Sequence, residues 1–288
     1  MHPLPQPDRF WEIRVGRLNP ENPGKGVSGL CVGYEQNQWR YSAFADYIME
    51  WLPEFCLNSK ERDELSYESA VKSLRKAANL VYQTDKYARR GEFGELFLHA
   101  AIRCVFESLP AISKLYYESS VNNTVKGFDC VHVVGPLDDL ELWLGEVKFY
   151  KKVSDAIRDV VAEIDEHLEV DFLRKEFILI GNKLGERDSY TAAVQRLISE
   201  RTSLDTIFKR ICIPVLLTYE SPVVEQHTAA TDEYIRDFCA EIERHFGTFH
   251  EKAANLPSVR IHLFLFPLED KERLIAALHK KLKAWQEI

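Results

Sequence analysis

The chain lacks the features that mark membrane-spanning, secreted and disulfide-bonded proteins. No stretch of its 288 residues approaches the ~18 apolar residues of a membrane-spanning helix. Its first residues, Met1–Pro5, lack the basic and apolar regions of a secretory signal. The six cysteines lie far apart and form no Cys-x-x-Cys pair. We therefore expect a cytoplasmic protein with free, mostly buried thiols and no membrane partner.

Signatures of several enzyme classes are also missing. The nine histidines form no H-x-x-x-H or H-x-H cluster, which argues against a zinc site. There is no Walker A loop, no Rossmann glycine fingerprint and no nucleophile elbow. Positive charge is scarce, since the net charge is −8. Because phosphate affinity comes mostly from Lys and Arg, a nucleic-acid-binding chain of this kind needs local basic patches or a partner that delivers the substrate.

The composition that is present, 45% hydrophobic and 28% charged, is typical of a globular protein. The length suffices for one elaborated domain or two. We expect an α/β fold with a mixed sheet in three regions. These are a largely helical N-terminal region at 1–86 that can dock a partner, a core at 87–220, and an α/β extension at 221–288 packed on the core.

Hydrophobic periodicity predicts the positions of the helices and strands. Helices are expected at Tyr41–Leu57, Ser66–Asp85, Glu92–Glu107, Ser154–Leu168, Ser189–Glu200, Asp232–His245 and Lys271–Trp285. Strands are expected at Lys114–Ser119, Phe128–Val134, Leu140–Phe149, Phe177–Ile180, Ile211–Tyr219 and Val259–Phe266. The run Phe177–Ile180 is wholly apolar, as in a strand buried on both faces. Pro214 favours an edge or a bulge for the strand that contains it.

Three charged residues fall on the two strands predicted at Phe128–Val134 and Leu140–Phe149. Asp129 lies on the first strand, and Glu146 and Lys148 lie on the second. Because side chains alternate across a strand, Glu146 and Lys148 share one face, which Leu142 and Leu144 also occupy. Charged groups that continue an apolar face are costly to bury unless something pairs them. A divalent cation would hold the two carboxylates, and the lysine could serve an anionic substrate.

A fourth charged residue is expected to face the core from the helix at Glu92–Glu107. Glu95 shares a helical stripe with Leu98 and Ile102, at i+3 and i+7. A carboxylate in the first turn can instead interact with the helix dipole, which is the structural alternative.

The predicted order αβββαβ, with Asp129 on the second strand and Glu146-Val147-Lys148 on the third, resembles the PD-(D/E)xK nuclease superfamily. The segment Arg90–Glu95 and the lead-in Gly127-Phe128 fit this resemblance. More narrowly, the chain resembles the HamA family, the nuclease subunits of Hachiman antiphage systems, most specifically over residues 87–182.

This resemblance implies a restriction-endonuclease-like core that hydrolyses DNA phosphodiester bonds with Mg²⁺ or Mn²⁺. The metal ligands would be Asp129, Glu146 and the Val147 carbonyl, and Glu95 would contact a second metal ion or an ordered water. Lys148 would orient the attacking water or stabilise the developing negative charge.

The resemblance also implies DNA and a superfamily 2 helicase of the HamB type as partners, in an antiphage effector. Phosphate contacts are possible from four basic residues close to the core motif, with solvated connections as the alternative for each. They are Arg89, Arg90, Lys151 and Lys152.

Two other functions remain open. One is a non-catalytic nucleic-acid-binding or assembly subunit on a nuclease fold, which the intact set of Asp129, Glu146 and Lys148 disfavours. The other is a stand-alone restriction-type endonuclease, which would give discrete DNA fragments rather than general degradation.

Overall fold

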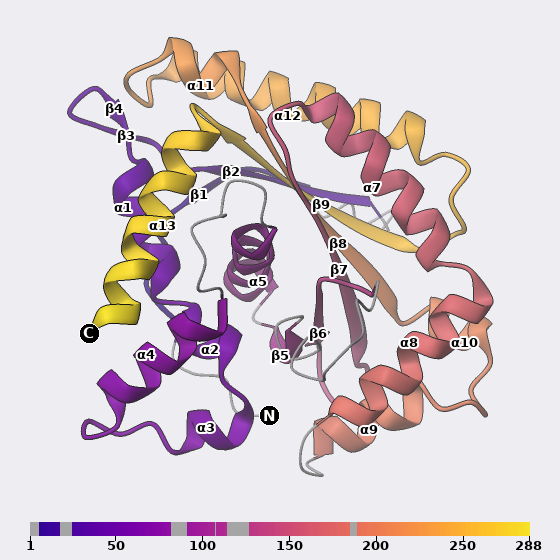
Figure 1. Cartoon of the computed structure of the whole chain (residues 1–288). Helices are drawn as coiled ribbons and strands as arrows, with labels where there is room; N and C mark the ends of the chain where they lie inside the picture. Colours follow the sequence, from indigo (N-terminus) through magenta and orange to yellow (C-terminus); the bar gives the residue numbers. More distant parts are fainter. Residues whose placement is uncertain (1–5, 18–24, 82–90, 107, 114–126, 185–188) are drawn as a thin grey trace.

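A seven-stranded mixed β-sheet forms the centre of the protein (Figure 1). The computed structural model describes residues 6–17, 25–81, 91–106, 108–113, 127–184 and 189–288. The strands of the sheet, in chain order, are β1 Glu12–Arg17, β2 Lys25–Cys31, β5 Leu109–Ser113, β6 Cys130–Val134, β7 Glu141–Phe149, β8 Ile211–Glu220 and β9 Arg260–Leu268. Their spatial order is β1-β2-β9-β8-β7-β6-β5. A separate two-stranded ribbon consists of β3 Tyr34–Glu35 and β4 Gln38–Trp39.

The strands of the sheet are parallel in its middle and antiparallel toward its two edges. β2, β9, β8 and β7 pair in parallel, whereas β1 pairs antiparallel with β2, and β6 pairs antiparallel with both β7 and β5. Strands from the N-terminal and C-terminal regions therefore belong to the same sheet as the strands of the expected core. The division of the chain at residues 86 and 220 stays a prediction.

Helices cover both faces of this sheet (Figure 1). They are α1 Tyr41–Met49, α2 Leu52–Cys56, α3 Ser59–Asp63, α4 Ala70–Val81, α5 Glu92–Phe106, α7 Val153–His167, α8 Val170–Lys183, α9 Ser189–Leu197, α10 Leu204–Phe208, α11 Pro222–Gln226, α12 Asp232–Lys252 and α13 Lys271–Glu287. Among the described residues, none of these helices combines the length and the apolar composition of a membrane span. All six cysteines are free and five of them are buried, as predicted.

The two helices nearest to the candidate site pack on opposite faces of β7. The backbone of α5 approaches the side chains of Val147 and Phe149. Helix α7 instead contacts Glu146 and Lys148, which point to the other face. On the α5 face, Phe44, Phe97 and Phe266 form an aromatic core with ring centroids 5.1–5.7 Å apart. Each such buried ring contributes roughly 1.5–3 kcal/mol, so this core joins α1, α5 and β9 firmly.

Most of the predicted elements are present. The helix predicted at Glu92–Glu107 is α5, and the strands predicted at Phe128–Val134 and Leu140–Phe149 are β6 and β7. The helix predicted at Ser154–Leu168 is α7. The strand expected at Lys114–Ser119 lies outside the described residues. Strand β5, which precedes it, pairs with β6.

The prediction of a strand at Phe177–Ile180 is wrong, because these residues lie within α8. Phe177 and Ile180 are buried together with Leu173, as a helical period requires, whereas Ile178 is 50% exposed. A short apolar run does not by itself separate a helix from a strand. The strand that follows α7 in the core order is therefore β8, which comes after the three further helices α8, α9 and α10.

Two predictions that involve proline also need correction. The helix expected over Tyr41–Leu57 is broken into α1 and α2, with Pro53 in the first turn of α2. Proline has no N–H to donate inside a continuous helix, so the break precedes it. β8, which contains Pro214, is not an edge strand, because it lies between β7 and β9. Pro214 falls in a gap in the β7–β8 pairing, between Cys212 and Val215.

The close packing of α5 on β7 depends on Gly94. A Cβ atom at this position would lie 2.6 Å from Cγ1 of Val147 and 3.2 Å from Cβ of Phe149. Such distances force the helix away from the strand that carries Glu146 and Lys148. At Gly247 in α12, by contrast, a Cβ atom would meet nothing within 4 Å.

We predict that Gly94→Ala lowers the free energy of unfolding by about 1–3 kcal/mol, as overpacking does. Gly247→Ala is the matched control, since it makes the same change in a helix with room for the methyl group. It is expected to raise stability by up to ~1 kcal/mol through helix propensity. Urea denaturation of the three proteins measures both effects. Equal stability of the two variants would contradict the proposed contact.

Candidate active site

Asp129 is held by the backbone of β7 immediately before β6 begins. Its N–H donates to the carbonyl oxygen of Gly145 at 2.8 Å. Its Oδ2 accepts a hydrogen bond from the N–H of Val147, also at 2.8 Å. The residue is 8% exposed. The carboxylate therefore lies against the β7 backbone, next to the residue that separates Glu146 from Lys148.

Glu146 is adjacent to Asp129 across the β6–β7 pair. The register pairs Cys130 with Gly145, so its continuation places Asp129 opposite Glu146 on one face. Glu146 is 1% exposed. Its Oε1 accepts a hydrogen bond from Nδ1 of His167, the last residue of α7, at 2.6 Å. Two buried carboxylates thus lie side by side beneath α7.

Lys148 forms an ion pair with Glu163 of α7. Burial opposes its charged form, but the hydrogen bond and the charge of Glu163, together with the charges of Glu146 and Asp129, outweigh burial and raise the pKa of Lys148. The side chain is 15% exposed, so the ammonium is at the boundary between the site and solvent. A lysine in this state supplies a stable positive charge and is a poor proton acceptor.

Glu95 is buried, as predicted, but it approaches from the other face of the sheet. It lies on α5, and it is 6% exposed. Burial raises the pKa of the Cys130 thiol well above its usual range, and the charges of Asp129, Glu95 and Glu146 raise it further. The three carboxylates thus act electrostatically on one thiol, although they come from both sides of the sheet.

The described residues contain a different group of three carboxylates with ligand atoms within 4.8 Å of one another, formed by Glu220, Asp270 and Glu272. Lys151 pairs with Glu272 and, at 3.5 Å, with Glu220. Asp270 caps α13 by accepting the N–H of Arg273 at 3.0 Å. These carboxylates serve ion pairs and a helix cap. Glu95, Asp129 and Glu146 do not form such a close group.

The basic residues proposed to contact phosphate differ in their surroundings. Lys151 is engaged by the two carboxylates just described. Lys152 is exposed at the start of α7 and forms no ion pair with the described residues. Arg89 and Arg90 lie outside the described residues. Lys151 is thus already paired with carboxylates and Lys152 is exposed, and a DNA contact at either residue stays a prediction.

Two residues at the site that sequence reasoning missed, Glu163 and His167, lie one helical turn apart on α7. His167 lies on the same buried helical stripe of α7 as Val160 and Ile164, at i+7 and i+3. A histidine on an otherwise apolar helix face was the available signal. Burial lowers the pKa of His167, so its imidazole is neutral at neutral pH and donates through one nitrogen.

A third missed residue, Glu176 of α8, packs its carboxyl group against Gly127, just before Phe128 and Asp129. A Cβ atom at Gly127 would lie 2.7 Å from Oε2 of Glu176. Glu176 is 3% exposed, and burial raises its pKa to about 7, although a hydrogen bond from the Phe128 backbone acts in the opposite direction. A side chain at position 127 would therefore displace this carboxyl group, which packs against the chain leading into β6.

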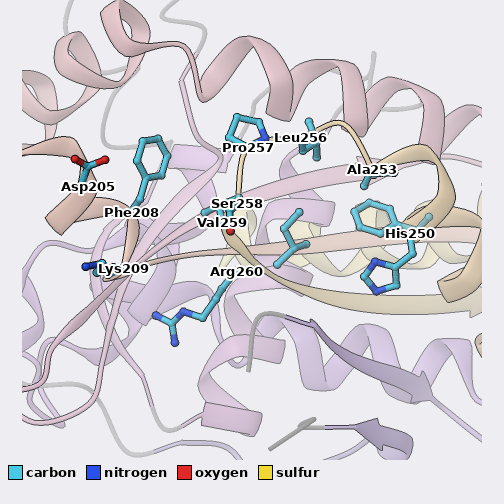
Figure 2. A pocket seen from close by; sticks show the side chains of 13 residues that line it. Asp205, Phe208, Lys209, His250, Ala253, Leu256, Pro257, Ser258, Val259 and Arg260 are labelled. Carbon is cyan, nitrogen blue, oxygen red and sulfur yellow. The ribbon is translucent and has the colours of Figure 1, made fainter. Parts of the chain in front are cut away.

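A pocket of about 1230 Å³ lies elsewhere, between α10, the end of α12 and the start of β9 (Figure 2). Its walls include Phe208, Leu256, Pro257 and Val259. In Figure 2 the charged ends of Asp205 and Lys209 lie on one side of the view, away from the apolar residues around Leu256. None of the candidate site residues lines this pocket.

The donor set at Asp129 and Glu146 fits a hard divalent cation. Both side chains offer carboxylate oxygens, both are buried, and they are neighbours on one face. Mg²⁺ commonly binds through one or two carboxylates and completes its coordination with water and substrate phosphate. The site therefore does not need a third protein carboxylate in contact with the same ion.

The protein has a mixed sheet between two layers of helices, and these carboxylates and Lys148 lie at its adjacent strands β6 and β7. This arrangement defines an α/β protein compatible with a nuclease-like core. The HamA family model matches residues 8–282, and the chain belongs to the HamA family.

The chain is also similar to "Anti-bacteriophage protein A" of Escherichia coli (strain K12). The two are 24% identical over 260 residues, which cover 87% of this chain and 46% of that protein. The chain thus spans about half the length of this relative. No solved structure matches this HamA-family chain.

The buried carboxyl of Glu176 generates a prediction about pH. Its folded-state pKa of about 7 lies above the ordinary glutamate value of 4.5, so the folded protein binds this proton more tightly than the unfolded chain does. The stabilising effect of the proton is therefore complete below about pH 4.5 and is lost as the pH rises through about 7. At ~1.4 kcal/mol per pKa unit, the loss amounts to roughly 3 kcal/mol.

We expect Glu176→Gln to remove this dependence, since an amide does not ionise. The stability of the variant relative to the parent should rise between pH 4.5 and about 7.5, as measured by urea unfolding across that range. Glu166→Gln is the control, because Glu166 is exposed on α7. Parallel stability profiles for parent and Glu176→Gln would refute the assignment of a shifted Glu176.

Proposed function

We propose that this HamA-family protein is an antiphage defence protein that acts as a divalent-metal-dependent DNA nuclease. The observation that carries this proposal is the placement of Asp129 and Glu146 as buried neighbours, with the charged amine of Lys148 next along the strand. The family membership and the name of the Escherichia coli relative support the defence role.

Asp129 and Glu146 would hold Mg²⁺ or Mn²⁺. The Val147 carbonyl is a further candidate ligand, because the N–H and C=O of one strand residue point toward the same neighbouring strand, and the Val147 N–H points to Asp129. When bound, the metal supplies Lewis-acid activation of the phosphate and of a water molecule. Glu95 would act through an ordered water or a second ion from the opposite face.

Lys148 would bind the phosphate and stabilise the negative charge that develops on its oxygens during hydrolysis. Its ion pair with Glu163 keeps the amine charged before substrate arrives. A phosphate oxygen then replaces the Glu163 carboxylate as the partner of this amine. Because the amine is held in its charged form, we assign it an electrostatic role and not that of a general base.

A superfamily 2 helicase of the HamB type is the partner that the family resemblance implies. The net charge of −8 supports dependence on a partner, because it weakens unaided association with DNA. The alternative function, a nucleic-acid-binding or assembly subunit without catalysis, is favoured by one observation. Glu146 and Lys148 already have protein partners on α7. A stand-alone restriction-type endonuclease would be recognised by discrete fragments.

We predict that Glu146→Gln and Lys148→Ala each reduce DNA cleavage at least a hundredfold, because the first removes a charged ligand of the proposed metal ion and the second removes the charge that would bind the reacting phosphate. Glu141→Gln is the matched control, since Glu141 is on the same strand but pairs with Arg260. The assay is plasmid degradation with Mn²⁺, with and without the partner helicase, and EDTA should abolish it. Parent-like cleavage by either site variant would rule out the assigned roles. Absence of cleavage by the parent in every condition would favour the non-catalytic alternative.

The two lysines after β7 give a second prediction. Lys152→Ala should weaken binding to duplex DNA and reduce the slope of log affinity against log salt by about 1, as loss of one phosphate contact does. Lys151→Ala should change both less, because Lys151 is paired with Glu220 and Glu272. Fluorescence anisotropy in EDTA at several salt concentrations measures binding without cleavage. Equal effects of the two substitutions would contradict this distinction.

A further inference from the structure

His167 contacts the more deeply buried of the two candidate metal ligands. The imidazole ends α7 and is 2% exposed. Its Nδ1 lies 2.6 Å from Oε1 of Glu146, a short distance for an N–H donor to a carboxylate. The rotation of the Glu146 carboxylate is therefore coupled to the position of this ring.

Aromatic side chains on two sides fix the position of the ring. Phe172 of α8 stacks on it with centroids 4.3 Å apart and planes 13° apart. Phe128 contacts it nearly edge-on, with centroids 5.1 Å apart and planes at 69°. Phe128 directly precedes Asp129, so the ring links the chain segments that carry both candidate ligands. Movement of His167 would disturb both aromatic contacts and the hydrogen bond to Glu146.

The same helix also holds the candidate catalytic lysine. Glu163, one turn before His167, forms the ion pair with Lys148. Residues four apart on a helix face the same neighbour, and here the neighbour is the charged end of β7. One rigid helix thus contacts Glu146 and Lys148 at the same time.

We propose that His167 is a positioning residue, which donates a hydrogen bond from its Nδ1–H to Glu146 and holds that carboxylate beside Asp129 for binding a divalent cation. The inference rests on the proposed metal-dependent function and adds a residue that acts through Glu146. Hydrogen-bond partners of metal ligands orient those ligands, and their loss commonly weakens metal affinity 10–100-fold.

The experiment is a Mn²⁺ titration of the full chain without DNA, followed by the electron paramagnetic resonance signal of free Mn²⁺. His167→Leu removes the donor, and His167→Asn is its counterpart of similar shape that retains an N–H donor at the δ position. We expect Mn²⁺ affinity at least tenfold lower for His167→Leu and within about threefold of the parent for His167→Asn.

A matched control separates this role from a general structural one. His262 is also a buried histidine with a hydrogen bond, since its Nε2 lies 2.9 Å from Oγ of Ser28. His262→Leu should leave Mn²⁺ affinity within about threefold of the parent. Phe172→Leu removes the ring stacked on His167 without changing any polar group, and it tests the proposal if His167→Leu does not fold. It should weaken Mn²⁺ binding about threefold or more.

The outcomes separate this inference from the function on which it rests. If Glu146→Gln abolishes Mn²⁺ binding but the folded His167→Leu and Phe172→Leu variants bind like the parent, the positioning role is wrong and the metal site stands. If His262→Leu weakens binding as much as His167→Leu, the role is merely structural. If the parent does not bind Mn²⁺, the metal-dependent function is overturned, and this inference with it.

Discussion

The antiparallel register between β6 and β7 is the constraint on which the candidate site depends. It pairs Cys130 with Gly145 and thereby brings Asp129 beside Glu146. A shift by one residue would turn Glu146 and Lys148 to the face covered by α5. Gly145 allows this register, because a Cβ atom there would lie 2.7 Å from Cδ2 of Leu98 and collide with the Cys130 sulfur. The Asp129 carboxylate adds a side-chain bond to the Val147 N–H where the ladder ends.

A buried polar cluster on the opposite face of the sheet, formed by Glu54, His99 and Arg103, restrains the helix that carries Glu95. His99 and Arg103 continue the helical stripe of Glu95 on α5. Oε2 of Glu54 on α2 lies 3.3 Å from Nε2 of His99 and accepts a hydrogen bond from Nε of Arg103 at 2.9 Å. The His99 ring also packs 5.1 Å from that of His132 on β6. Burial opposes ionisation of Glu54, but its bonds and charge interactions with His99 and Arg103 lower its pKa to about 2. Breaking such a buried pair costs about 3–5 kcal/mol, so α5 has little freedom to rotate or slide.

The parts of the fold that sequence alone predicts are those fixed by local patterns. Alternation along one strand was enough to place Glu146 and Lys148 on a common face, and helical spacing was enough to bury Glu95. Contacts that join distant segments left no such pattern. The neighbours β2 and β9, for example, are more than two hundred residues apart in the chain, and the pairing of Glu163 with Lys148 depends on how α7 is rotated over the sheet. The run Phe177–Ile180 was misread because helices and strands can both bury a short apolar segment.

The candidate site carries more negative than positive side chains, counted over both faces of the sheet. The carboxylates of Asp129, Glu146 and Glu163 all act on the charge of Lys148, whereas Glu95 lies on the opposite face and acts with Asp129 and Glu146 on Cys130. On the proposed function, a divalent cation would relieve the repulsion between Asp129 and Glu146, and a DNA phosphate would take the place of Glu163 beside Lys148. On this proposal the two changes would be coupled, because the phosphate would join Asp129 and Glu146 as a third anion, which the site would accept more readily once the metal charge was present. The proposed chemistry would therefore favour metal binding before DNA binding.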